Sequence, residues 1–339
     1  MILVTGGTGL VGSHLLQHLV KQKQQIRAIK RTTSDLSAVK NIADKIEWFD
    51  ADLLDVHGLH QAFAGVEKVY HCAAFISFSP ADALKMKEIN IKGTANIVNM
   101  ALEHHIKKMI YMSSIAALGR NKRSFQLDEK AKWEEHEFNS DYALSKHLAE
   151  REVWRGAAEG LNVAIVNPSV ILGTNNFHRG SGQLIRRVYD GLKFFPAGGT
   201  AFVDVEDVVQ IMMQLMESDI SNERFIINAE NLSYQDFFKL TAKHLNVAAP
   251  NIKATRFMTE LAWRFEAIKC TLLRKTPLIT KSSARIAQQR YYYDNAKIKN
   301  ALKYEFMPFE TTIKNVCHSF LKEHKSVSYT HLRAHETSE

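Results

Sequence analysis

The first twelve residues constrain the fold more than any other stretch of the chain. Residues 2–4 form an apolar run that suits a buried strand of a parallel sheet, and apolar residues recur at helical spacing from Leu15 onward. Between the two stand the glycines Gly6, Gly9 and Gly12. A strand, a glycine turn and a helix in this order are typical of a dinucleotide-binding site. The segment therefore predicts an α/β fold with a Rossmann-like, doubly wound parallel sheet.

Each glycine of this segment has a distinct expected role. Gly6 allows the chain to turn tightly, Gly9 lets the backbone approach a pyrophosphate, and Gly12 lets the helix pack closely. The N-terminus of the helix offers unpaired N–H groups and a partial positive charge to the phosphates. The residues expected to contact the cofactor here are Thr5, Gly6, Gly7, Thr8, Gly9, Leu10, Val11 and Gly12.

The end of the second predicted strand bears on the choice of cofactor. Residues 26–29 form this strand, and Lys30 and Arg31 follow it directly. A site for NAD has an acidic residue about 20 positions beyond the glycines, where it binds the ribose 2′-hydroxyl. Cations at this place suit a 2′-phosphate, so we expect NADP(H) to be preferred and NAD(H) to be the second choice. The alternative is that both side chains only solvate the strand end.

Further cofactor contacts are expected where other strands end, because ligands of open α/β sheets bind outside the carboxyl ends of the strands. Asp52 follows a strand predicted at 46–49, and it either contacts the adenine or caps the next helix. Small residues follow the strand predicted at 66–71 and would let the cofactor lie across it. The residues expected to contact the cofactor at these ends are Asp52, Leu53, Ala73, Ala74, Pro168 and Ser169.

Tyr142 and Lys146 stand four residues apart in a predicted helix, so both side chains emerge on one helix face. An unperturbed phenol has a pKa of about 10 and exchanges protons poorly at neutral pH. A neighbouring ammonium group favours the phenolate, so we expect Lys146 to lower the pKa of Tyr142 into a useful range for acid–base catalysis. The alternative is an exposed tyrosine that stacks on a lysine stem.

A polar pair, Ser113 and Ser114, closes the strand that precedes this helix. With the glycine segment and the Tyr142–Lys146 pair, it resembles the extended short-chain dehydrogenase/reductase family, part of the NAD-dependent epimerase/dehydratase superfamily, over roughly residues 1–320. In that family the tyrosine is the general acid/base, the lysine lowers its pKa and holds the nicotinamide ribose, and the serine binds the substrate oxygen. The resemblance implies catalytic roles for Ser114, Tyr142 and Lys146, of which Tyr142 and Lys146 also contact the cofactor.

The loop after the serine pair distinguishes branches of the family. By its distance from Gly119, Ser114 matches the family's catalytic serine better than Ser113. Dehydratases have an Asp-Glu pair in this loop, whereas residues 115–118 here are Ile-Ala-Ala-Leu. The chain thus resembles the dihydroflavonol reductase and 3-beta-hydroxysteroid dehydrogenase branch, which implies hydride transfer between a nicotinamide cofactor and a ketone or secondary alcohol of a small apolar substrate. Two alternatives are a nucleotide-sugar epimerase with tightly bound NAD and a non-catalytic dinucleotide-sensing module.

The composition argues against several other classes. Lys and Arg number 44 and Asp and Glu 36 among 339 residues, and this formal charge of +8 is scattered, so we expect an anionic cofactor and no nucleic-acid partner. The three cysteines are far apart and lack metal spacing, so we expect no metal site and a reduced, cytoplasmic location. The first strand begins at residue 2, which leaves no room for a signal peptide, and no apolar run approaches the roughly 18 residues of a membrane helix.

The alternation of strands and helices stops midway through the chain. We expect residues 1–173 to form the dinucleotide-binding domain with the catalytic residues, and residues 174–325 to form mainly a substrate-binding lobe that interleaves with the last sheet strands. Residues 326–339 lack periodicity and are interpreted as a disordered or non-native tail. The family resemblance implies a homodimer through helices near residues 85–104 and 141–158.

One further stretch has an apolar stripe at helical spacing with basic residues beside it. Such a helix packs on its own domain or lies on a membrane surface, and we expect the first because it is the commoner case. The stripe consists of Phe257, Leu261, Phe265, Ile268 and Leu272, with Arg256, Arg264, Lys269 and Arg274 at its flanks.

Overall fold

A sheet of seven strands forms the centre of the computed structural model, which describes residues 1–77, 79–120, 125–135, 139–174, 177, 180–273 and 280–336. Every neighbouring pair of strands in this sheet is parallel. The predicted Rossmann-like, doubly wound α/β fold is therefore confirmed. The strands are β1 (Ile2–Thr5), β2 (Ile26–Lys30), β3 (Glu47–Asp50), β4 (Lys68–His71), β5 (Lys108–Met112), β7 (Val163–Pro168) and β11 (Glu223–Ile227).

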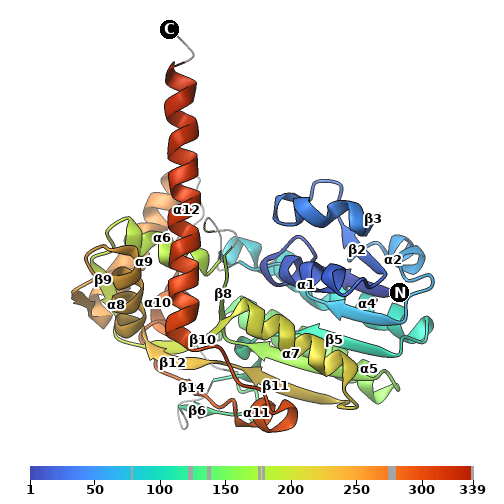
Figure 1. The fold of residues 1–339 in the computed structure, drawn as a ribbon. Helices are drawn as coiled ribbons and strands as arrows, with labels where there is room; N and C mark the ends of the chain where they lie inside the picture. Colours follow the sequence, from blue (N-terminus) through green and yellow to red (C-terminus); the bar gives the residue numbers. More distant parts are fainter. Residues whose placement is uncertain are drawn as a thin grey trace.

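The strand order β11–β7–β5–β4–β1–β2–β3 reverses between β1 and β4 (Figure 1). After β1 the chain builds outward through β2 and β3, and it then crosses back and builds the other way from β4. Open α/β sheets bind ligands at such a switch point, outside the carboxyl ends of the strands. The glycine segment follows β1, and Ser113 and Ser114 follow β5, so both stand at this edge of the sheet.

Helices cover both faces of the sheet because the side chains of each strand alternate between them. Val4 of β1 belongs to the core under α1 and α7, whereas its neighbour Leu3 belongs to the core under α2, α4 and α5. Burial on both faces explains why the strands are nearly continuous apolar runs. These helices are α1 (Leu10–Lys21), α2 (Val56–Ala62), α4 (Gly93–Glu103), α5 (Asp141–Ala158) and α7 (Val205–Glu217).

The second half of the chain adds a lobe beside the sheet (Figure 1). Its core is aromatic: Phe202 stacks on Phe237 with ring centroids 4.4 Å apart, and Phe309 lies 5.6 Å from Phe202. The same half also returns to the main sheet, through β11 and α7. The lobe contains β8 (Val170–Leu172), β9 (Phe194–Pro196), β10 (Gly199–Asp204), β12 (Glu230–Ser233), β13 (Ile252–Ala254), α6 (Gly182–Tyr189), α8 (Tyr234–Leu245), α9 (Arg256–Leu273), α10 (Lys281–Ile286) and α12 (Phe309–Glu336).

The remaining elements are short and mostly connect larger ones. A two-stranded pair joins β6 to β14 and so links the loop after β5 to the end of the lobe. The other short elements are helices that lead from one strand to the next. The short elements, with these two strands, are η1 (Ser37–Lys45), η2 (Pro80–Asp82), α3 (Ala83–Lys87), η3 (Glu88–Lys92), η4 (Ile115–Leu118), β6 (Gln126–Leu127), β14 (Tyr292–Tyr293) and α11 (Ala296–Leu302).

The long helix between β4 and β5 contains a π-helical turn, η3, between α3 and α4. This turn contains Asn90, whose side chain accepts from the N–H of Phe75 (2.7 Å) and donates to its carbonyl (2.9 Å). Asn90 also donates to Ser145 of α5 at 3.0 Å. The wider turn thus fixes the loop after β4 to the helix that carries Tyr142.

Helix α12 continues through residues 326–336, where the sequence predicts a tail without regular structure. Phe309 and Ile313 are buried in its first turns, and a helix that has been nucleated extends with one hydrogen bond per added residue. Among the described residues, no helix combines the length and the apolar character needed to cross a membrane.

Candidate active site

The glycine segment forms a tight turn that only glycine can make at two positions. Gly6 has a φ of +70°, and a Cβ there would lie 2.7 Å from the backbone nitrogen of Ala73. A Cβ on Gly12 would lie 2.1 Å from the carbonyl oxygen of Gly6. Thr5 anchors the turn, because its hydroxyl contacts His71 Nδ1 at 2.7 Å and accepts from the N–H of Ala73 at 3.2 Å. The start of α1 is therefore held directly beside the ends of β1 and β4.

The first turn of α1 is open to an anion. Gly9 is its N-cap and contributes no side chain, and no side chain among the described residues caps this end. The turn contains no acidic residue. The first N–H groups of a helix lack partners within it and carry a partial positive charge, so they can bind a phosphate. Thr8, Gly9 and Leu10 are at least partly exposed at this turn, whereas Gly7, Val11 and Gly12 are buried.

The strand-end residues differ in how well they suit a dinucleotide. Ala73 and Ala74 are half-buried beside the glycine turn. Pro168 and Ser169 are buried at the end of β7, and the Ser169 hydroxyl has no hydrogen-bond partner in the part of the chain that the structure describes. A buried polar atom without a partner costs free energy unless a ligand or water satisfies it. The glycine cradle and this hydroxyl thus fit a bound dinucleotide.

The residues after β2 and β3 lie on the other side of the switch point. Lys30 forms an ion pair with Asp50 at 2.5 Å, whereas Arg31 is exposed. Asp52 is also exposed and accepts from the N–H of Leu54 at 3.0 Å. Helix α2 is capped by Asp55, which accepts from the N–H of Gly58 at 3.0 Å, so the alternative that Asp52 caps this helix is wrong.

Leu53 packs under the start of α4. A Cβ on Gly93 would lie 2.9 Å from the Leu53 Cβ, and Asn96 donates to the Leu53 carbonyl at 2.8 Å. The Leu53 side chain is half-buried. Leu53 thus has a packing role of its own in the structure, independent of any ligand.

Tyr142 lies in the first turn of α5, where Ser140 caps the helix by accepting from the N–H of Ala143 at 3.1 Å. Its hydroxyl is hydrogen-bonded to Ser114, whose Oγ also accepts from the N–H of Ala116 at 3.1 Å. Two hydroxyl groups, one from the end of β5 and one from the start of α5, therefore meet at the edge of the sheet where the strands end.

The pKa of Tyr142 moves in the direction opposite to the expected one. Burial raises it above its ordinary value, and the hydrogen bond from Ser114 opposes that rise only in part. Both hydrogen bonds of the Lys146 ammonium go to β5, to the Tyr111 hydroxyl at 2.9 Å and the Met112 carbonyl at 2.8 Å. The expected lowering by Lys146 is thus absent from this structure, and Tyr142 keeps its proton at neutral pH.

Lys146 is a buried cation, only 2% exposed. Burial lowers its pKa to about 7, although the negative charge of Glu150, one helical turn further along α5, acts to raise it. A lysine with such a pKa changes its charge close to neutral pH, which an exposed lysine does not do. The environment of Lys146 is therefore one that is found more often at reactive sites than on ordinary helix faces.

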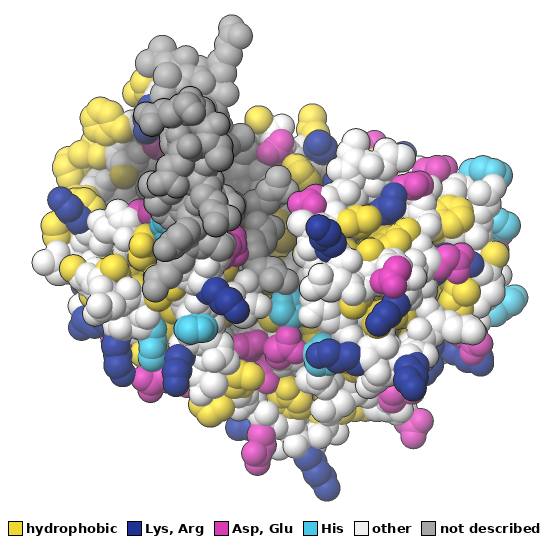
Figure 2. Space-filling view, turned by 45° about the horizontal axis from the view of Figure 1, so that its top comes forward, with side chains coloured by type: hydrophobic (Ala, Val, Ile, Leu, Met, Phe, Trp, Pro, Cys, Tyr) yellow, Lys and Arg dark blue, Asp and Glu magenta, His cyan; other side chains and the backbone are white. Residues whose placement is uncertain are grey.

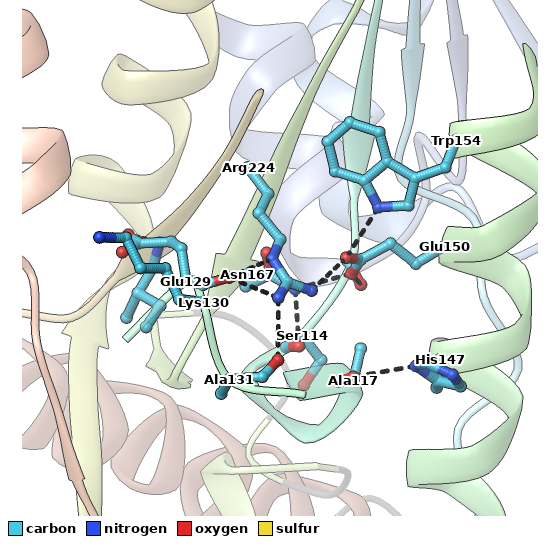
Figure 3. Close-up of polar contacts among 12 residues, drawn as sticks. Ser114, Ala117, Glu129, Lys130, Ala131, His147, Glu150, Trp154, Asn167 and Arg224 are labelled. Carbon is cyan, nitrogen blue, oxygen red and sulfur yellow. Dashed lines mark hydrogen bonds and ion pairs between the residues drawn. The ribbon is translucent and has the colours of Figure 1, made fainter. Parts of the chain in front are cut away.

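A network of hydrogen bonds lies behind Ser114, and the sequence analysis did not predict it (Figure 3). Buried Glu150 accepts from Ser113 Oγ (2.6 Å), Asn167 Nδ2 (2.8 Å) and Arg224 Nη1 (3.1 Å). Asn167 also donates to the Ser114 carbonyl at 3.0 Å. The Ser113 hydroxyl is thus occupied by a hydrogen bond inside the protein. The network also fixes the backbone that carries Ser114. Glu150 shares the inner face of α5 with Lys146, four residues earlier, and that spacing was the available signal.

Arg224 connects this network to the loop after β5. From β11, it donates to the backbone carbonyls of Glu129 and, at 3.1 Å, Ala131 (Figure 3). The Glu129 carboxylate accepts in turn from the N–H of Ile226 at 2.8 Å. The loop beside Ser114 is therefore held by a strand almost a hundred residues further along the chain.

The loop Ile-Ala-Ala-Leu after Ser114 forms the short helix η4, and its apolar side chains point mostly into the protein. Ile115 and Leu118 are buried against Leu127, Tyr291 and Tyr293. They pack inside the protein because β14 brings the two tyrosines beneath the loop. Of the four loop residues, only the second one, an alanine, is half-exposed, so the loop offers little apolar surface to a substrate.

The topology, the glycine cradle and the Ser114–Tyr142 contact define an α/β enzyme site of the dinucleotide-binding class. Residues 2–228, about two thirds of the chain, match the NAD dependent epimerase/dehydratase family, and the chain belongs to that family. It is an NAD(P)-dependent oxidoreductase.

Similar proteins agree with this assignment. The chain is 28% identical over 324 residues to a putative dihydroflavonol 4-reductase from Synechocystis, with 94% of this chain and 93% of the relative covered. It is 29% identical over 262 residues to anthocyanidin reductase from Arabidopsis thaliana, covering 68% and 76% of the two chains. The crystal structure of UDP-glucose 4-epimerase from Thermotoga maritima superposes with a TM-score of 0.78 at 22% identity, over 95% of this chain and 99% of that one, which shows the shared fold.

Proposed function

We propose that this protein reduces the ketone group of a small apolar substrate, or oxidises the corresponding secondary alcohol, with Ser114, Tyr142 and Lys146 as its catalytic residues. The observation that carries the proposal is the contact between the Ser114 and Tyr142 hydroxyls at the carboxyl edge of the sheet. Two O–H groups that meet at one point can both donate to a single carbonyl oxygen placed there.

A bound nicotinamide dinucleotide would supply or accept the hydride. In the reducing direction, Ser114 donates a hydrogen bond to the carbonyl oxygen as negative charge develops on it. Tyr142 holds its proton in the resting state and donates it to the same oxygen, so that a C–H and an O–H bond form as the carbonyl double bond is lost. Lys146, whose ammonium donates to the Tyr111 hydroxyl and the Met112 carbonyl in this structure, would hold the nicotinamide ribose when the cofactor is bound.

The cofactor contacts are proposed as predicted, with NADP(H) preferred over NAD(H). Lys30 is already paired with Asp50, so exposed Arg31 is the more available partner for a 2′-phosphate. Lys30→Asp combined with Arg31→Ala should shift the preference toward NAD(H), and Arg31→Ala alone should account for most of that shift. The ratio of kcat/KM for the two cofactors measures it, and an unchanged ratio in the double variant removes the NADP assignment.

The reductase function is preferred over the alternative, a nucleotide-sugar epimerase with tightly bound NAD. The relatives named above with the higher identity are called reductases. An epimerase reduces and reoxidises one tightly held NAD within a turnover. Dinucleotide that copurifies and does not exchange with added cofactor would therefore favour the epimerase.

Three wider properties belong to the same proposal. Residues 1–173 supply the cofactor site, and residues 174–325 supply most of the substrate surface. Free, buried Cys72, Cys270 and Cys317 suit a reducing compartment, so we propose a cytoplasmic location. We further propose a homodimer through the helices near residues 85–104 and 141–158. Sedimentation velocity would measure its mass.

The direct test is a panel of aliphatic and aromatic ketones incubated with purified protein and either NADPH or NADH. Consumption of the reduced cofactor with at least one ketone, and faster with NADPH, is expected. Tyr292→Phe is the control variant, because that residue is 42% exposed and its hydroxyl should be dispensable. No consumption of either cofactor with any ketone, together with non-exchanging bound NAD, contradicts the proposal.

A further inference from the structure

Helix α9 has its apolar stripe on the outside of the protein, which reverses the sequence-based expectation. The exposed fractions are 72% for Phe257, 68% for Phe265, 60% for Ile268 and 40% for Leu261. On a helical wheel these four positions fall within an arc of about 80°. The stripe therefore does not pack on its own domain. Soluble proteins rarely leave such a contiguous apolar surface in water without a partner for it.

The opposite face of α9 attaches the helix to the lobe. Helix α9 packs against α10, and Cys270 is buried on this side. Glu260 accepts from Trp263 at 3.0 Å and from Arg285 of the α10 segment at 3.1 Å. These hydrogen bonds, together with one from Arg264 of the same helix, hold the pKa of Glu260 at about 2, well below its ordinary value. The helix is thus fixed by polar contacts, with its apolar side chains directed away from the protein.

The charges on α9 are distributed unevenly about the apolar arc. Arg264 and Lys269 are exposed and stand on opposite borders of it, about 20° and about 40° beyond its outermost side chains, and Arg264 is ion-paired with Glu260 at 2.6 Å. The two carboxylates of the helix, Glu260 and Glu266, fall on the inner half of the wheel. The outer surface is therefore apolar at its centre and cationic on both sides.

The surface next to α9 has the same character. Strand β13 leads into the helix and pairs with β9, where Ile252 lies opposite Phe194. These two side chains are 42% and 45% exposed, and Lys253 between them and the helix is also exposed. Hydrophobic side chains gather at the upper left of the space-filling view, on the lobe that carries α9 (Figure 2). The apolar surface is thus wider than a single helix face.

We propose that α9 binds the surface of an anionic lipid bilayer. The helix lies in the plane of the interface, with Phe257, Leu261 and Phe265 inserted below the headgroups and the flanking Arg264 and Lys269 at the level of the phosphates. Cations on both borders complement an anionic surface, and their long stems let the charge remain in water while the helix is embedded. A protein partner or a second copy of the chain would need carboxylates to match these cations, whereas anionic lipids supply that charge at every position.

This inference is independent of the proposed reaction, and vesicle binding tests it. The full-length protein is sedimented with vesicles of phosphatidylcholine, with and without phosphatidylserine. Stronger binding to the phosphatidylserine vesicles is expected. Phe257→Ser combined with Phe265→Ser should lower the partition coefficient by about tenfold or more, because two large apolar side chains are lost. Lys269→Gln should lower it by about fivefold on anionic vesicles only.

The control is Val56→Ser, which removes an exposed apolar side chain (50%) from the opposite half of the molecule and should leave binding unchanged. Unchanged thermal unfolding and cofactor binding would show that each variant is folded. Equal binding by the wild type and the double Phe variant overturns the proposal, as does a lack of binding to both kinds of vesicle. A wild-type dimer that the double Phe variant dissociates would assign the surface to a protein contact and would equally overturn it.

Discussion

Helices α5 and α9 are each 18 residues long, and they break the usual distribution of side chains in opposite ways. Helix α5 buries charged residues, Lys146 and Glu150, which are each 2% exposed. Helix α9 exposes large apolar residues, Phe257 and Phe265. In most helices charged residues face the solvent and large apolar residues face the core. Neither arrangement would persist without a compensating interaction.

The difference lies in where the compensation comes from. The buried charges of α5 are satisfied inside the chain: Glu150 has four donors within hydrogen-bonding distance, and Lys146 has two acceptors. The apolar surface of α9 cannot be satisfied by the chain, because no part of it reaches over that face among the described residues. Buried charged residues inside a protein thus mark a reactive or structural site. Large apolar residues exposed on its outside mark a contact with another molecule.

The largest expected effect comes from Tyr142, at the start of α5. Tyr142→Phe removes the O–H that we propose as the proton donor, so we expect kcat to fall by about 10²-fold or more. The ring remains, so the dissociation constant for NADPH should change little. Stopped-flow turnover and cofactor fluorescence titration measure the two quantities. A fully active variant would refute the catalytic assignment.

The next largest effect concerns the buried pair behind the site. Glu150→Ala leaves the guanidinium of Arg224 without its carboxylate, and we expect the free energy of unfolding to fall by about 3–5 kcal/mol. Glu152→Ala is the matched control on the same helix: its partner Arg155 is 36% exposed, so the loss should stay below about 1 kcal/mol. Urea unfolding measures both, and equal losses would show that the network does not stabilise the fold.

The pH dependence of stability isolates Lys146. Its pKa is lowered from 10.5 to about 7 by burial, so between these values the unfolded chain binds a proton that the native state has released. The free energy of unfolding therefore rises by up to about 1.4 kcal/mol per pH unit as the pH rises through this window. Below about pH 7 the lysine is charged in both states, so the full cost of burying that charge lowers the stability there. Lys146→Met removes this contribution.

Urea unfolding between about pH 7 and about pH 9 should consequently show a smaller rise for Lys146→Met than for the wild type. Lys21→Met, which changes an exposed lysine of α1, is the control and should follow the wild type. Parallel pH profiles for Lys146→Met and the wild type would contradict a lowered pKa.

The smallest effect is expected on α9. Phe265→Ser should change the free energy of unfolding by less than about 0.5 kcal/mol, because the ring is already in water. Phe237→Ala in α8, where the ring is fully buried, should cost about 3–5 kcal/mol. Differential scanning calorimetry measures both. A large loss from Phe265→Ser would mean that the ring packs on the protein after all.

The parts of the structure that sequence predicted are those governed by local patterns. The glycine segment, the strand runs and the spacing of Tyr142 and Lys146 depend on neighbours a few residues away, and these features appear in the structure where the sequence places them. The assignment of functional roles to these residues remains a prediction. Periodicity also placed Phe257 and Phe265 on one face of α9, but it could not indicate whether that face meets the core.

The parts that sequence missed depend on residues far apart in the chain. Ile115 is buried because Tyr291 and Tyr293 come to lie beneath it, and Glu150 can be buried because Arg224 arrives from β11. The pKa of Tyr142 rises because the fold closes around it, and its four-residue spacing from Lys146 contains no information about that burial. A one-dimensional pattern specifies which side chains share a face, whereas desolvation depends on the whole assembly.

The position of Arg224 has a consequence for how this chain can be divided and recombined. The loop beside Ser114 is tied to β11, whereas β11 follows the first part of the lobe in the sequence and precedes the rest of it. A fragment that ends at residue 173 would keep the glycine turn but lose the anchor of its reactive loop. Chimeras that exchange lobes between relatives therefore need junctions on both sides of residues 223–227, so that this strand stays with the N-terminal parent.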